Sequence, residues 1–277
     1  MINIILSSEY SYFILLMIIA AIPVGFFAGL FGIGGGLITV PFLFFIFEAL
    51  DVDKMYVMHL AVGTSFAIII PTSFVSVFTH NKHSSVDFKI IKSYGIFVIS
   101  GVTSGTIFAT FLETKSLVLF FSIIVYLLGI YLLFLKDNAE DIKINFTMLP
   151  RIIFGFISGF ISAPMGIGGA VMNVPILKYF GYSINRAIGS AAAIGFIIAV
   201  FGAIGFLTAG SVLKVNLPLS ISFINIPAFL IFIPITTVMA RIGANAVHKI
   251  NKKNVTKLFG IFLFFVGSIF LYRYFQI

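Results

Sequence analysis

Two glycine-rich stretches contain the residues best suited to bind a ligand. They read Gly32-Ile33-Gly34-Gly35-Gly36 and Gly166-Ile167-Gly168-Gly169-Ala170, and each lies inside a long apolar segment. Because glycine has no Cβ, the backbone can bend there, and a helix broken inside a membrane leaves N–H and C=O groups that lipid cannot satisfy. The N–H groups at the start of a half-helix attract anions. We therefore expect an anion site at these breaks, with close helix packing through small residues as the alternative.

Small polar side chains accompany both stretches at matching positions. Thr39 and Asn173 each lie two residues before a proline, and Thr64, Ser65 and Ser190 follow a glycine in the next apolar segment. Such groups suit a small oxyanion, although each can also bond to its own helix backbone. Arg186 is expected at the mouth of the site, with binding to lipid phosphate as the alternative. The expected substrate-binding residues are Gly34, Gly35, Gly36, Thr39, Thr64, Ser65, Gly168, Gly169, Asn173, Arg186 and Ser190.

Other kinds of chemistry find little support in the sequence. The chain has no cysteine, its four histidines show no His-x-x-x-His spacing, and no Gly-x-Ser-x-Gly motif occurs. The glycine stretches also lack the Lys-Ser/Thr of a phosphate loop. We therefore expect no enzyme activity, no metal and no cofactor. Charged residues are absent from the middle of the apolar segments. An anion would then be attracted by backbone dipoles and hydroxyls, and the membrane potential alone could expel it.

The composition indicates the solvent in which these residues work. Of the 277 residues, 60% are hydrophobic and 9% are charged, and the mean hydropathy is +1.18. A soluble protein of this size could not bury so much apolar surface. The sequence therefore predicts an all-α polytopic membrane protein. It excludes a cytosolic enzyme, a disordered chain and a nucleic-acid-binding domain.

The chain repeats itself about its middle. Gly25-Phe26-Phe27-Ala28-Gly29 before the first stretch is echoed by Gly155-Phe156-Ile157-Ser158-Gly159 before the second, where a four-residue insert contains Ala163-Pro164. We expect one transmembrane domain over residues 1–277. It would comprise a first repeat at 12–135, a connecting loop at 136–150 and a second repeat at 151–274, each repeat a Gly-broken segment followed by three transmembrane helices. The apolar segments are 12–47, 58–79, 93–112, 116–135, 152–180, 186–208, 218–240 and 257–274.

The loop charges predict how the two repeats are oriented. If every apolar segment crosses once, the two sides carry 9 and 8 Lys or Arg residues, which is no bias. If each Gly-broken segment instead returns to its own side, as a re-entrant segment or a helical hairpin, 13 lie on one side and four on the other. The four are Lys54, Lys115, Lys214 and Arg273. Since cytoplasmic loops are rich in Lys and Arg, we expect two inverted repeats, a multi-pass protein of the cell membrane and extracytoplasmic termini.

The paired Gly-x-Gly-Gly stretches, each followed by Val-Pro, resemble those of the TauE/SafE family of membrane proteins. The resemblance extends over about residues 14–274 and includes Asn185-Arg186-Ala187-Ile188-Gly189-Ser190. It implies transport of sulfite or another small sulfur-containing or organic anion. One departure is visible, because Ala170 stands where the first stretch has its third glycine.

Together these observations predict a small-anion transporter that works by alternating access between the two breaks, with sulfite or a simple organosulfonate as substrate. The alternative is a membrane scaffold or accessory subunit without transport activity. The expected partners of the transporter are the anion and membrane lipid, with no nucleic acid. A homo-oligomer is possible, because Gly101-x-x-x-Gly105 suits close packing either with a second chain or within the protomer.

Overall fold

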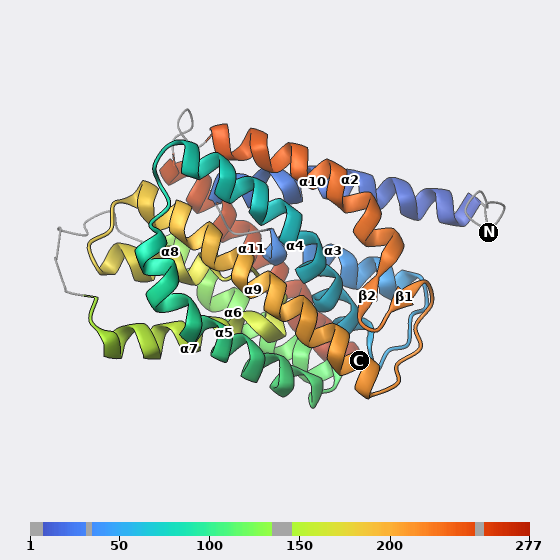
Figure 1. The fold of residues 1–277 in the computed structure, drawn as a ribbon. Coiled ribbons are helices and arrows are strands. Elements are labelled where there is room, and N and C mark those ends of the chain that lie inside the picture. Colours follow the sequence, from blue (N-terminus) through green and yellow to red (C-terminus); the bar gives the residue numbers. More distant parts are fainter. Residues whose placement is uncertain (1–7, 32–34, 135–145, 247–251) are drawn as a thin grey trace.

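The computed structural model describes residues 8–31, 35–134, 146–246 and 252–277. Within these ranges, eight helices are long and apolar enough to cross a membrane, which confirms the predicted all-α polytopic architecture. The helices run side by side in one bundle (Figure 1). The eight are α2 (Ser8–Phe31), α4 (Val57–Lys82), α5 (Phe88–Thr110), α6 (Thr114–Phe134), α7 (Met148–Met165), α9 (Ile184–Val212), α10 (Ile226–Ala246) and α11 (Lys252–Gln276).

Two shorter helices follow the glycine-rich stretches. These are α3 (Gly36–Ala49) after α2 and α8 (Ala170–Tyr179) after α7. Glycines with positive φ stand at the N-caps of both, Gly35 at 84° and Gly169 at 65°. An L-residue with a side chain rarely adopts such values, so glycine is what allows the chain to turn and restart a helix here. The predicted break is present in both segments.

The helices of the two halves pack in matching pairs. Helix α2 packs most extensively on α10 and α7 on α5, while α4 and α9 contact each other near the centre. Glycines make these approaches close. A Cβ on Gly29 would overlap the carbonyl of Ala240, and a Cβ on Gly159 would overlap that of Val98. The predicted Gly101-x-x-x-Gly105 contact lies within the protomer, because both glycines face the backbone of α7.

Side-chain contacts identify the helix ends that lie together. Arg273, in the last turn of α11, forms an ion pair with Glu48 at the end of α3, at 2.6 Å. Thr114, the first residue of α6, donates a hydrogen bond to Met55, which precedes α4. The C-terminal end of α3 therefore lies beside the start of α4, the start of α6 and the end of α11.

A different set of ends meets around α8. Phe180 at the C-cap of α8 stacks on Phe146, and Phe154 in α7 contacts the same Phe180 ring. The guanidinium of Arg151, in the first turn of α7, lies 5.3 Å from the Phe146 ring. The start of α7 and the end of α8 are thus close together, so α7 and α8 form a hairpin that returns toward its own starting end.

The apolar segment expected at 218–240 is divided in the structure. Residues 220–225 form a short antiparallel hairpin, β1 (Ser220–Ile221) and β2 (Ile224–Asn225), and α10 begins only at Ile226. The physical reason is local, because the Asn225 carboxamide accepts a hydrogen bond from Ala228 and so caps the first turn of α10. Hydropathy alone does not register such a cap.

Candidate functional site

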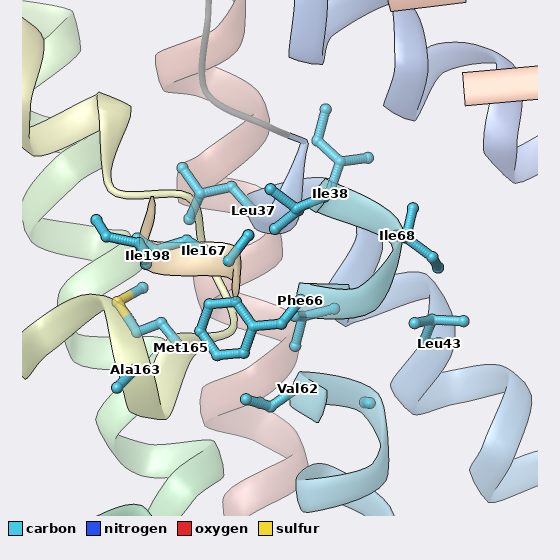
Figure 2. Packing of buried hydrophobic residues seen from close by; sticks show 14 of the residues in the cluster. Leu37, Ile38, Leu43, Val62, Phe66, Ile68, Ala163, Met165, Ile167 and Ile198 are labelled. Atoms are coloured by element: carbon cyan, nitrogen blue, oxygen red, sulfur yellow. The ribbon is translucent and has the colours of Figure 1, made fainter. Parts of the chain in front are cut away.

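The two breaks meet in the buried interior of the protein. A Cβ on Gly36, the first residue of α3, would overlap the carbonyl of Gly166 and stand 2.7 Å from the Cα of Ile167. The Ser65 hydroxyl of α4 donates to the same Gly166 carbonyl at 2.8 Å. Figure 2 shows Leu37, Phe66, Met165 and Ile167 packed at this meeting point. Of the predicted residues, Gly36 and Ser65 are therefore brought together with the second break.

Thr39 and Asn173 occupy equivalent places one turn into α3 and α8. Each is fully buried and donates to the carbonyl of its own N-cap glycine, Thr39 to Gly35 at 3.0 Å and Asn173 to Gly169 at 2.8 Å. These bonds hold both side chains at the starts of the short helices. The N–H groups of Ile38 and Met172 donate to the same two glycine carbonyls, and the glycine caps bring no side chain to the N–H groups that precede them.

Thr64 and Ser190 have a different task in the structure. Thr64 accepts a hydrogen bond from the backbone N–H of Asn225, and Ser190 accepts one from that of Asp87, both at 2.9 Å. Asn225 directly precedes α10, and Asp87 is the N-cap of α5. Both hydroxyls therefore hold the start of a neighbouring helix, and each still has its own O–H to donate.

The remaining predicted residues are Gly168 in the second break, Arg186 in α9, and Gly34. The carbonyl oxygen of Gly168 lies 2.5 Å from where a Cβ on Gly195 of α9 would stand, so this part of the second break packs against α9. Arg186 is exposed in the first turn of α9, outside the buried centre. Gly34 falls outside the described residues.

A buried polar cluster lies beside Gly169, and we name it the second-break cluster. It consists of Tyr94, Ser158, Ser162 and Asn173, of which sequence reasoning predicted only Asn173. All four side chains are fully buried. The Tyr94 hydroxyl donates to the Asn173 carboxamide at 2.7 Å and lies 3.4 Å from the Ser158 hydroxyl. The two serines were visible one helical turn apart, but Tyr94 comes from α5 and had no local signal.

A set of charged and aromatic groups lies at the end of α8. Burial and the carboxylate of Asp87 raise the pKa of Tyr182, whereas Arg151 and Arg186 act in the opposite direction. These four residues therefore share one electrostatic neighbourhood: Tyr182 and Asp87 lie between helices, and the two arginines lie in the first turns of α7 and α9. Arg186 thus lies at the end of the bundle where α7 begins and α8 ends, and its role at the mouth of an anion site stays a prediction.

A groove with a volume of about 510 Å³ lies elsewhere, between α2, α3 and α11. Its lining residues are apolar, among them Pro23, Phe42 and Phe265. With no polar group in its lining, the groove offers nothing to hold a desolvated anion. The breaks, rather than this groove, are the candidate site.

Eight apolar helices in the described part of the chain, with two glycine-broken segments that meet inside the bundle, define a multi-pass membrane protein. The family model for the sulfite exporter TauE/SafE matches residues 16–270, and the chain belongs to this family.

Curated relatives cover nearly the whole chain. A "Probable membrane transporter protein" of Haemophilus influenzae is 32% identical over 256 residues, which are 92% of this chain and 97% of the relative. A protein named in the same way from Methanocaldococcus jannaschii is 29% identical, over 96% and 98% of the two chains. A third, from Bacillus subtilis, is 23% identical over 94% and 98%. No solved structure matches the chain.

Proposed function

We propose that this protein transports a small anion, sulfite or a simple organosulfonate, across the cell membrane through a site between the starts of α3 and α8. The observation that carries the proposal is the meeting of the two breaks, where Gly36 lies against Gly166. Half-helix N-termini in a membrane interior attract negative charge, and membership of the sulfite exporter family favours a sulfur oxyanion.

Two further inferences belong to this proposal. The matching helix pairs α2 with α10 and α7 with α5 support two repeats, and the different surroundings of the ends of α3 and α8 support an inverted relation between them. Alternating access would then come from rocking one repeat against the other. At the centre both breaks are tightly packed, which is expected of an occluded conformation.

Flux measurements on the purified protein test the proposal. Proteoliposomes should take up labelled sulfite or methanesulfonate faster than empty liposomes. Gly169→Ala should lose most of this flux while still inserting, because the alanine would stand at φ 65° and overlap Ile198. Gly95→Ala serves as the control, since its new methyl would meet only the end of the Ile197 side chain at 3.3 Å. A scaffold or accessory subunit would give no flux with any anion.

The driving force can be measured in the same liposomes. Because the middle of the apolar segments carries no charged residue, we predict that export depends on membrane potential, which is worth about 2.3 kcal/mol per charge per 100 mV. Valinomycin and potassium gradients set the potential, and the sulfite flux should follow it. A rate that ignored voltage but followed a pH gradient would contradict this mechanism.

A further inference from the structure

We propose that the anion's oxygen atoms bind in the second half of the protein, where Ser162, Asn173 and Tyr94 form an oxyanion subsite at the start of α8. The subsite rests on the transport function proposed above and assigns the recognition of the anion to side chains of α7, α8 and α5.

Ser162 is the first support for the subsite. Its side chain is fully buried, and among the described residues its hydroxyl has no hydrogen-bond partner. The oxygen lies 3.0 Å from the point where a Cβ on Gly169 would stand, so it faces the N-cap of α8. A buried hydroxyl without a partner costs stability unless something completes it. An anion oxygen at the start of α8 would accept this O–H.

Asn173 and Tyr94 converge on the same place. The Asn173 amide nitrogen lies 3.1 Å from the point where a Cβ on Gly169 would stand. One of its N–H groups donates to the Gly169 carbonyl, which leaves the second N–H for a ligand. The Tyr94 hydroxyl holds the other end of this carboxamide at 2.7 Å. The tyrosine uses its single O–H for this bond, so it positions the amide whose second N–H is left for the anion.

The first half does not repeat this set of donors. Ala28 stands at the place of Ser158 in the repeated motif, and Thr236 faces Gly25 as Tyr94 faces Gly155. The Thr236 hydroxyl is already engaged, because it donates to Phe232 at 2.8 Å and accepts from Thr72 at 3.1 Å. Ser162 itself belongs to the stretch lengthened by the four-residue insert.

Positive charge lies on the same side as the subsite. The centroids of the Phe146 and Tyr94 rings are 5.5 Å apart, and the Arg151 guanidinium lies 5.3 Å from the centroid of the Phe146 ring. One aromatic ring thus separates Arg151 from the second-break cluster. Its Nε is buried and, within the described part of the chain, has no hydrogen-bond partner. This cation favours an anion that approaches from the start of α7.

Ser162→Ala gives the sharpest test, because the subsite and a purely structural role predict opposite results. If the hydroxyl binds the anion, KM for sulfite uptake should rise at least about tenfold, as expected for one lost bond to a charged ligand. The unfolding temperature of the protein without anion should stay the same or increase, since an unsatisfied group has been removed. A lower unfolding temperature with an unchanged KM would overturn the proposal.

Tyr94→Phe and Thr236→Val form a matched pair of hydroxyl deletions in the two halves. Tyr94→Phe should raise KM for sulfite by about tenfold, whereas Thr236→Val should keep KM within about twofold of the parent. Equal effects of both variants would overturn the asymmetric subsite while leaving transport itself established. If the parent protein carries neither sulfite nor methanesulfonate, the transport proposal fails and the subsite fails with it.

Discussion

Small polar side chains next to glycine serve two purposes in this protein. Thr39 and Asn173 bond to the carbonyl of an N-cap glycine inside their own segment, whereas Thr64 and Ser190 accept backbone N–H groups from other helices. In the sequence all four look alike, because each is a short polar residue in an apolar stretch. Only the hydrogen-bond partner distinguishes a side chain that bonds within its own helix from one that holds the start of another helix.

Ser190→Ala is predicted to loosen the start of α5. The substitution leaves the Asp87 N–H without its acceptor, and losing such a bond at a partly buried site costs about 1–3 kcal/mol of the free energy of unfolding. Hydrogen exchange at the Asp87 and Lys89 amides should become faster, as measured by mass spectrometry in detergent. Ser100→Ala, which removes an exposed hydroxyl from the same helix, should leave that exchange unchanged.

At the scale of whole helices, the strongest packing depends on glycines that face a backbone. Gly159 against Val98 and Gly29 against Ala240 let α7 approach α5 and let α2 approach α10. Both glycines belong to the motifs that repeat in the two halves of the sequence, yet the sequence could not say which helix each would pack against. That choice depends on how non-neighbouring helices are arranged, and no local pattern encodes it.

Gly159→Ala is predicted to destabilise the α5–α7 pair. The added Cβ would overlap the Val98 carbonyl, a backbone atom that cannot turn aside as a side chain can, so we expect a loss of about 1–3 kcal/mol or more. Gly95→Ala in α5 meets only a flexible side-chain end, and the better helix propensity of alanine should add up to about 1 kcal/mol. Thermal unfolding of the two purified variants compares them directly. Equal stability would contradict the packing account.

For the molecule as a whole, hydropathy and glycine placement predicted the membrane-spanning helices and the two breaks. The β1–β2 hairpin escaped prediction because Phe223 and Ile224 are as apolar as a helix requires. The second-break cluster escaped it because Tyr94 lies far from Asn173 in sequence and is brought there only by the packing of α5 on α7. Local sequence patterns predict the helices, whereas the asymmetry of the proposed site arises from contacts between helices that are distant in sequence.

The arrangement of the bundle in the membrane follows from charge and can be tested without first removing native thiols, because the chain has no cysteine. The exposed Ser183 lies between α8 and α9 and follows Tyr182, which interacts with Arg151 and Arg186. Its loop belongs to the side on which 13 Lys or Arg residues are expected. Asn216, exposed after the far end of α9, lies in the sparsely charged loops. The positive-inside rule therefore assigns Ser183 to the cytoplasm and Asn216 to the opposite face.

In intact cells, a membrane-impermeant maleimide should label Asn216→Cys at once but label Ser183→Cys only after the membrane is opened. The reverse order would invert the topology, and labelling of both from outside would show that α9 does not cross, which would remove the basis for two inverted repeats.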